Sequence, residues 1–176
     1  MKKISTLLIL LFVGTLISAQ TISISKKGFF INKVKISESW QLSDFKKGLG
    51  EADHITDKAS YVNRVHYYEN KGIIFWEPVS DSGKIIEIQL FLSLSKGVND
   101  TYNKTKKIFP GVTTVDKLKL SNSITANDIK NALKTWTQVK CYFTNGYKYS
   151  NGIVAINFIF NAEETKLLSL DMSPAN

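Results

Sequence analysis

The hydrophobic positions alternate with polar ones in several short runs of the chain. Every second residue is apolar in two stretches: Ile86, Ile88, Leu90, Leu92 and Leu94 form the first row, and Val154, Ile156, Phe158 and Phe160 form the second. Leu168, Leu170 and Met172 add a third. Alternation with a period of two predicts β-strands that bury one face. We therefore expect these rows to face the core of an antiparallel sheet.

Two other segments have the spacing of short helices. Leu42, Phe45 and Leu49 fall at positions i, i+3 and i+7 and are followed by Gly50. Ala126, Ile129 and Leu133 repeat this spacing, with Thr125 and Asp128 placed to form a capping box. The glycine is typical of a helix end, and the Thr/Asp pair is typical of a helix start. Each segment is therefore predicted to be a helix with one buried face.

One passage of the chain is present twice. Asn32–Leu49 reads NKVKISESWQLSDFKKGL, and Asp116–Leu133 reads DKLKLSNSITANDIKNAL 84 positions later. Of the twenty positions aligned from Phe30 onward, seven are identical. Each copy begins as a hairpin that turns at Asn32 or Asp116, because these residue types tolerate a positive φ. We expect an α+β fold of two tandem ββαβββ-like units, each a short helix packed on an antiparallel sheet.

The remaining strands follow from the alternating runs and the turn residues between them. We expect strands at His66–Asn70, Ile73–Val79 and Lys84–Leu94 in the first unit, and at Val139–Asn145, Ile153–Asn161 and Lys166–Met172 in the second. Thr21–Ser25 is expected to add one strand at the amino end. The predicted organisation is a signal peptide at 1–19, a first unit at 20–96, a linker at 97–110 and a second unit at 111–176.

The amino end has the features of an export signal. Lys2 and Lys3 precede an apolar run from Leu7 to Leu16, and Ala19 offers a small residue at a cleavage point. This pattern predicts removal of the segment and a periplasmic or secreted protein without a transmembrane segment after cleavage. No cysteine lies near the cut, which argues against a lipoprotein anchor.

Charge and cysteine content do not indicate a specific partner or activity. The formal net charge is +8, but the lysines are scattered rather than interleaved with aromatic residues on one face, which argues against a nucleic-acid partner. A basic surface that weakly favours anionic envelope components is the simpler interpretation. Cys141 is the one cysteine, so it forms no internal disulfide, and its alternating neighbours predict burial on a strand.

No set of residues in the sequence indicates catalysis, a metal ion or a cofactor. Only two histidines exist, His54 and His66. His54 lies in an acidic segment that includes Asp57, which leaves open an unrecognised hydrolase, although an ordinary loop is the more common case. Gly48-Leu49-Gly50 ends a helix, whereas a dinucleotide-binding fingerprint must follow a strand. We therefore expect a protein that is not an enzyme.

The second face of the predicted sheet carries an unusual mixture of polar and large apolar residues. The candidate partner-binding residues on it are Phe75, Glu77, Glu87, Gln89, Phe91, Asn157 and Asp171. A solvated face would be more polar, and a buried face would not hold several unpaired polar groups. We expect this face to dock an unknown protein partner. Two alternatives stay open: a half-exposed face without a partner, and a carrier that holds a small molecule or lipid in the crevice between the units.

Three resemblances accompany this pattern. The helix end Leu49-Gly50-Glu51-Ala52-Asp53, followed by antiparallel strands, resembles the small outer-membrane lipoprotein A family, but Ala52 replaces its usual proline and the lipid-bearing cysteine is missing. Its role in outer-membrane assembly is therefore not transferred. The tandem helix-and-sheet plan looks like beta-lactamase inhibitor protein, a secreted binder with a concave sheet.

The segment Gly28-Phe29-Phe30-Ile31-Asn32, with the helix and its Leu-Gly ending, resembles the corresponding part of a family of bacterial domains of unknown function. That resemblance implies no chemistry. Together, these likenesses favour an exported inhibitor-like or immunity-like binding protein.

Overall fold

The chain folds as two series of elements with the same order. The computed structural model describes residues 20–56, 62–93 and 105–175. After β1 (Thr21–Ser25), the first series is β2 (Gly28–Ile31), β3 (Val34–Ile36), α1 (Leu42–Leu49), β4 (His54–Thr56), β5 (Asn63–Tyr68), β6 (Ile73–Pro78) and β7 (Glu87–Phe91). The second is β8 (Val112–Val115), β9 (Leu118–Leu120), α2 (Ala126–Ala132), β10 (Thr137–Val139), β11 (Gly146–Ser150), β12 (Val154–Phe160) and β13 (Leu167–Pro174).

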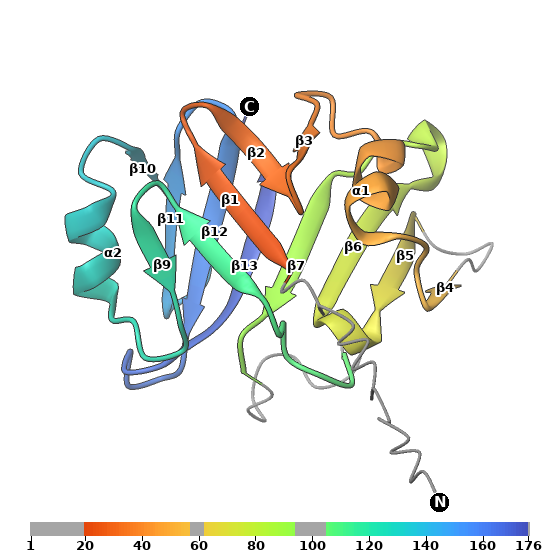
Figure 1. The fold of residues 1–176 in the computed structure, drawn as a ribbon. Coiled ribbons are helices and arrows are strands. Elements are labelled where there is room, and N and C mark those ends of the chain that lie inside the picture. Colours follow the sequence, from red (N-terminus) through yellow and green to blue (C-terminus); the bar gives the residue numbers. More distant parts are fainter. Residues whose placement is uncertain (1–19, 57–61, 94–104, 176) are drawn as a thin grey trace, which may run out of the picture.

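The strands form two sheets in two layers. The large sheet has eight strands in the order β10-β11-β12-β13-β7-β6-β5-β4, and the small sheet has five in the order β3-β2-β1-β8-β9. All neighbouring strands are antiparallel except β1 and β8. The small sheet and both helices lie over the same side of the large sheet (Figure 1). The predicted α+β class, with short helices packed on antiparallel sheets, is confirmed.

The two units meet edge to edge at the centre of the large sheet. Strand β7 pairs with β13, and the register places Gln89 directly opposite Asp171. These two residues are equivalent positions, because Lys84 and Lys166 mark the same point of each unit 82 residues apart. The pair Gln89–Asp171 therefore lies on the approximate two-fold axis that relates the units. In the small sheet, β1 lies between the equivalent strands β2 and β8.

The core lies between the two sheets. The apolar rows on β7, β12 and β13 are buried there, α1 adds Phe45 and Leu49, and α2 adds Ile129. The Phe45 ring on α1 lies 5.0 Å from that of Phe75 on β6 and 5.6 Å from that of Trp40. Full burial of one such side chain stabilises the fold by about 1.5–3 kcal/mol. Aromatic packing thus fixes α1 to the large sheet, whereas α2 is held by the aliphatic Ile129.

The sequence signals for turns and caps are confirmed locally. Asn32 and Lys33 adopt φ values of 49° and 69° in the first hairpin, and Asp116 adopts 52° in the second. The Asn32 side chain donates to the Gly48 carbonyl at 2.7 Å, which ties the hairpin to the end of α1. Thr125 and Asp128 form the predicted capping box of α2.

Some predicted strands differ from the observed ones. Val139–Asn145 was predicted as one strand, which is wrong, because β10 ends at Val139 and residues 140–145 form a loop before β11. Cys141 therefore lies in a loop and is half-buried, rather than buried on a strand. Each helix is followed by four strands instead of three, since β4 and β10 add a short strand at each outer edge.

Two apolar rows are also displaced from their predicted faces. An irregularity between Ile159 and Phe160 shifts the register, so Leu167 rather than Leu168 enters the core. Ile85 is fully buried in the core, whereas Ile86 is exposed. Strand β7 begins only at Glu87, so the alternation assumed from Ile86 onward starts later than predicted.

Several predicted segments lie outside the described residues. These are the signal peptide at 1–19 and most of the linker. Within the described part of the linker, Phe109 is buried and its N–H donates to the Phe91 carbonyl at 2.8 Å. No helix among the described residues is long and apolar enough to cross a membrane.

Candidate functional site

The candidate site lies on the face of the large sheet that points away from the small sheet and the helices, here called the open face. Its central row runs across four neighbouring strands: Lys148, Asn157, Asp171 and Gln89 are consecutive partners in the register. Glu87 and Phe91 flank Gln89 on the same side of β7, because alternate residues of a strand share a face. The site is therefore centred on the junction between the two units.

Several polar atoms of the open face are buried without a partner. Asp171 Oδ1, Gln89 Oε1 and Ser169 Oγ are inaccessible, and none of them has a hydrogen-bond partner among the described residues. Gln89 is 7% exposed and Ser169 is 1% exposed. A buried polar atom without a hydrogen bond costs about 1–3 kcal/mol. Gln89 Oε1 only accepts, and the Asp171 carboxyl group only accepts once it is ionised, so the ionised cluster is rich in acceptors.

The two carboxyl groups of the site hold protons unusually strongly. Burial, followed by the charge of Glu87, raises the pKa of Asp171 to about 7, although a hydrogen bond from Gln89 opposes the shift. Burial also raises the pKa of Glu87, and the Lys148 ammonium group partly opposes this. Two carboxylates in a poorly solvated place repel each other, and the neutral form of one is then favoured. The pair is therefore only partly ionised near neutral pH.

Residues 140–145, here called the strap, fold over one side of this cluster. Cys141 Sγ donates to Asn157 Oδ1 at 3.1 Å. Gly146 permits this approach, because a Cβ atom there would lie 2.6 Å from Cys141 Sγ and 3.0 Å from Asn157 Oδ1. The strap also presents Tyr142, which is 91% exposed, and Phe143, which is 50% exposed. The strap thus places Phe143 beside the buried polar cluster and leaves Tyr142 exposed to solvent.

A small pocket lies between the strap and the sheet. Its volume is about 140 Å³, and it is lined by Glu87, Phe143, Lys148, Asn157, Asp171, Met172 and Ser173. Both carboxyl groups and the Phe143 side of the strap contribute to it. The small pocket is therefore lined by two acidic groups, an amide and an aromatic ring.

Five of the seven predicted site residues share the open face. These are Glu87, Gln89, Phe91, Asn157 and Asp171. Phe75 and Glu77 do not share it, because the register pairs Phe75 with Ile88, which faces the core. Phe75 is 0% exposed and packs against Phe45. The placement of Phe75 and Glu77 on the mixed face is corrected accordingly.

Glu77 instead holds a turn on the core side of the sheet. Its carboxylate accepts from Gly83 N–H at 2.6 Å and from Ser82 Oγ at 3.0 Å, and it lies 2.6 Å from His66 Nε2. Burial alone would raise the pKa of Glu77, but the hydrogen bonds from Gly83, His66 and Ser82 outweigh it and lower that pKa. Both His66 and Glu77 are buried, so we assign them a structural role.

His54 lies at the outer edge of the large sheet. Its ring stacks on Tyr67 with centroids 4.4 Å apart, and its Nδ1 lies 3.5 Å from a Glu69 oxygen. Asp57, the acidic residue with which it was grouped, lies outside the described residues. Within residues 20–56, 62–93 and 105–175, no group of three or more His, Cys, Asp and Glu side chains could hold a metal ion.

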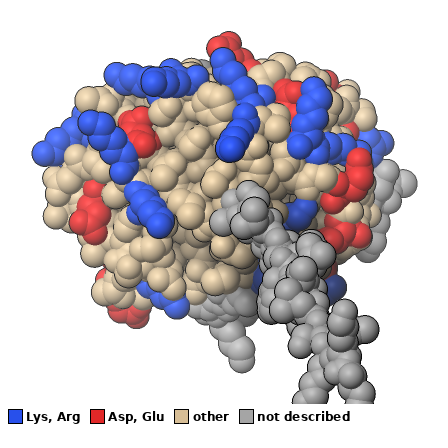
Figure 2. All heavy atoms as spheres, in the orientation of Figure 1, with Lys and Arg blue, Asp and Glu red and all other residues tan. Residues whose placement is uncertain are grey.

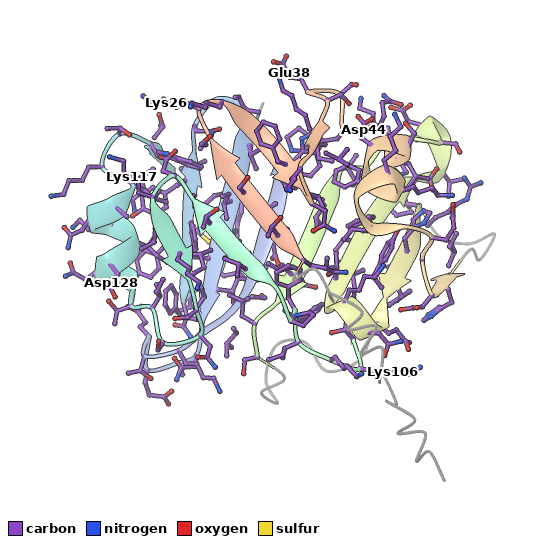
Figure 3. The ribbon with its side chains drawn as sticks, in the orientation of Figure 1. Lys26, Glu38, Asp44, Lys106, Lys117 and Asp128 are labelled. Atoms are coloured by element: carbon purple, nitrogen blue, oxygen red, sulfur yellow. The ribbon has the colours of Figure 1, made fainter. Side chains whose placement is uncertain are left out.

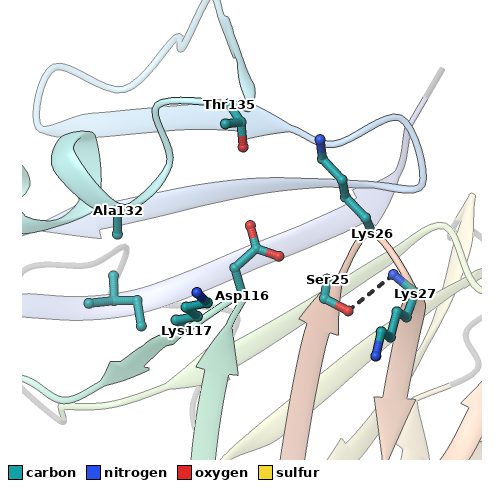
Figure 4. A pocket seen from close by; sticks show the side chains of 8 residues that line it. Ser25, Lys26, Lys27, Asp116, Lys117, Ala132 and Thr135 are labelled. Carbon is teal, nitrogen blue, oxygen red and sulfur yellow. Dashed lines mark hydrogen bonds between the residues drawn. The ribbon is translucent and has the colours of Figure 1, made fainter.

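A second cavity opens on the opposite side of the molecule. It is a groove of about 790 Å³, lined by Ser25, Lys26, Lys27, Asp116, Lys117, Leu118, Ala132 and Thr135. Figure 4 shows the two hairpin turns and the end of α2 around it. Basic side chains are spread over this whole side (Figure 2), and Lys26 and Lys117 extend outward from it (Figure 3).

Sequence reasoning missed four residues of the open-face site. They are Tyr142, Phe143, Lys148 and Ser169. The segment Thr144-Asn145-Gly146 is a turn signal that could have ended the predicted strand earlier and left the two aromatic residues in a loop. Two adjacent aromatic residues next to such a signal are consistent with an exposed loop rather than a core strand. No pattern within one strand indicates Ser169 or Lys148.

Comparison with solved structures finds only distant likenesses. An extracellular protein containing a SCP domain from Bacillus anthracis str. Ames gives a TM-score of 0.47 at 9% identity, over 76% of this chain and 43% of that protein. A DUF4309 family protein from Bacillus subtilis subsp. subtilis str. 168 gives 0.44 at 13% identity, over 82% of this chain and 84% of that protein. This chain thus spans less than half of the SCP-domain protein.

Comparison of the sequence with models of protein families identifies the family of this chain. The search of curated proteins finds no match. The model of a domain of unknown function, DUF7738, matches residues 21–130, which begin with β1 and end within α2. The match covers more than half of the 176-residue chain. The chain therefore belongs to the DUF7738 family.

Proposed function

We propose that the protein is exported and acts as a non-enzymatic binding protein whose protein partner docks on the open face of the large sheet. Export is supported by Lys2 and Lys3, the apolar run Leu7–Leu16 and the small residue Ala19. The folded part described begins at Gln20, whose carbonyl accepts from Val112 N–H at 2.8 Å.

The cluster of buried polar atoms without partners is the observation that carries this proposal. Asp171 Oδ1, Gln89 Oε1 and Ser169 Oγ lie on neighbouring positions of β13 and β7. A buried polar atom that stays without a hydrogen bond costs about 1–3 kcal/mol. Such a cost is seldom kept without a function. Because the three atoms are inaccessible, a partner would supply donors to them only if the surrounding side chains move on binding.

Aromatic residues beside the cluster support a protein partner. Tyr142 and Phe143 are exposed on the strap, whereas Phe91 and Ile159 on the sheet are only 7% and 6% exposed. Protein interfaces combine exposed aromatic anchors with a small number of buried polar groups. An exposed tyrosine next to a partly buried phenylalanine suits this role better than it suits a solvated loop.

The placement of the histidines supports a non-enzymatic role. His66 is buried against Glu77, and His54 stacks on Tyr67 near Glu69. Neither histidine bonds a serine, threonine or cysteine side chain within the described part of the chain. A serine, threonine or cysteine nucleophile that is activated by a histidine base needs the two side chains within hydrogen-bond reach of each other.

Capture by variants of the two faces tests the proposal. The protein is immobilised and exposed to proteins of the culture medium and cell envelope, in parallel with Tyr142→Ala/Phe143→Ala on the strap and Lys35→Ala/Lys119→Ala on the outer face of the small sheet. A partner retained by the wild type and the lysine variant, but lost from the aromatic variant, is the expected result. Equal retention by all three proteins would contradict docking on the open face.

A carrier of an anionic small molecule is a second candidate, favoured by the groove between the two hairpin turns. Its 790 Å³ volume is within the range of small-molecule sites. Lys26, Lys27 and Lys117 line it beside Leu118 and Ala132, a combination that suits an anionic amphiphile. Titration with 1-anilinonaphthalene-8-sulfonate tests this candidate. Binding that is lost in Lys26→Ala/Lys27→Ala/Lys117→Ala would support it, and no binding by the wild type would exclude it.

A further inference from the structure

The pocket under the strap identifies the chemistry that the partner must present. We infer that it receives the guanidinium group of an arginine side chain from the protein partner proposed above, on which this inference rests. Three features of the pocket favour this ligand: the hydrogen-bonding groups around it, the balance of charge, and its size and walls.

The unused groups around the pocket are acceptors. Asp171 Oδ1 and Gln89 Oε1 are buried without partners, and Asp171 lines the pocket. The two residues are directly opposite in the register, so their side chains are neighbours on the face. A guanidinium group offers five N–H donors in a rigid plane and accepts none. It can therefore donate to the carboxyl groups of Glu87 and Asp171, which both line the pocket, whereas a single ammonium group does so with less directional fit.

The balance of charge also favours a cation. The charged and titratable groups that face Asp171 are Glu87 on β7, Lys148 on β11 and Cys141 in the strap. The Lys148 ammonium group partly opposes the rise in the pKa of Glu87, whereas the charge that acts on Asp171 is that of Glu87, which raises its pKa further. The site therefore has two carboxyl groups and one cation. A positive group from outside would let Asp171 ionise at neutral pH.

The size and the wall of the pocket suit a flat cation. Its volume of about 140 Å³ corresponds to roughly four or five water molecules, taking about 30 Å³ for each. That is room for a guanidinium group and part of its stem, but not for a large ring system. Phe143 forms one wall. Cations, and arginine in particular, stack favourably on aromatic faces.

Three blocked peptides that differ in one side chain test the inference. Gly-Arg-Gly, Gly-Lys-Gly and Gly-citrulline-Gly are titrated into the isotope-labelled protein, and the side-chain amide signals of Gln89 and Asn157 are followed by NMR. Citrulline has nearly the shape of arginine without its charge. We expect the arginine peptide to bind at least tenfold more tightly than the citrulline peptide, with the lysine peptide between them.

Variants and pH sharpen the test. Asp171→Asn should weaken binding of the arginine peptide at least tenfold, whereas Glu51→Gln, which changes an exposed carboxyl group near the end of α1, should not alter it. Because the pKa of Asp171 is about 7, the wild type should bind about tenfold more weakly at pH 6 than at pH 8. The Asn variant should lose this dependence on pH.

The outcomes separate this inference from the proposed function. Equal binding of the arginine and citrulline peptides, or unchanged binding in Asp171→Asn, overturns the arginine pocket. If the captured partner is still lost from Tyr142→Ala/Phe143→Ala in that case, docking on the open face stands without it. Binding of the arginine peptide that is lost in Asp171→Asn supports the pocket, even if the partner proves to dock elsewhere.

Discussion

The buried carboxyl group of Asp171 should make the stability of the protein fall as the pH rises. Its pKa moves from an ordinary 3.8 to about 7 on folding. Between these two values the unfolded chain has already lost the proton, while the folded protein still holds it. Proton release therefore favours unfolding, and stability decreases as the pH increases through this window.

The size of this effect follows from the shift. One pKa unit corresponds to 1.36 kcal/mol, so a shift of about three units lowers the free energy of unfolding by about 4 kcal/mol once the pH exceeds 7. About 3 kcal/mol of this falls between pH 5 and pH 8. Asp171→Asn keeps the shape of the side chain and removes the ionisation. The variant should therefore lose this part of the pH dependence.

Urea unfolding at pH 5, 6, 7 and 8 measures the difference between the two proteins. Groups whose pKa is lowered, such as Asp44 and Glu77, titrate below this range and affect both proteins equally. We expect the stability of the wild type to fall relative to Asp171→Asn as the pH rises, so that the variant is the more stable protein at pH 8. If plots of unfolding free energy against pH were parallel for the two proteins, the claim that Asp171 is buried with a raised pKa would be refuted.

Three further substitutions test other parts of the fold. Gly146→Ala places a Cβ atom 2.6 Å from Cys141 Sγ, so it should displace the strap and lower the free energy of unfolding in urea by about 1–3 kcal/mol. Cys141 should then react faster with a thiol reagent. An unchanged reaction rate would contradict this packing. Thr125→Ala removes the side-chain cap of α2 and should cost about 1 kcal/mol, whereas Gln41→Ala, at the start of α1 where no side-chain cap exists, should change stability by less than about 0.5 kcal/mol. Phe75→Ala should lower the free energy of unfolding by about 3–5 kcal/mol, because this ring is fully buried against α1. A smaller loss would contradict the placement of Phe75 in the core.

The parts of the fold that could be predicted from the sequence depend on local signals. Asn32 and Asp116 mark the hairpin turns, and Thr125 with Asp128 marks the start of α2. Each of these signals acts within a few residues, and the repeat supplies each of the hairpins and helices twice. The duplicated order of hairpin, helix and strands was therefore predictable without knowledge of long-range contacts.

The face assigned to β6 was not predictable in the same way. Ile73, Ile74 and Phe75 are consecutive apolar residues, so the alternation gives no indication of which of them face the core. Only pairing with β7 decides it, since Phe75 lies opposite Ile88 and Ile74 opposite Gln89. A shift of one residue exchanges the two faces of a strand.

The candidate site was partly predictable for a related reason. On β7 the polar residues Glu87 and Gln89 alternate with apolar ones, which identifies the open face. Their neighbour Asp171 comes from the other unit, and the strap comes from a loop that had been assigned to a strand. The direct pairing of Gln89 with Asp171 depends on how the two units join, which no local pattern encodes.

Site-specific photo-crosslinking tests the docking face most directly. A photoreactive phenylalanine analogue is placed at Tyr142 on the strap in one protein and at Phe30, on the outer face of the small sheet, in another. Both proteins are exposed to light in the presence of the captured partner. Docking on the open face predicts an adduct from position 142 and none from position 30. An adduct from position 30 alone, or equal adducts from both, would contradict it.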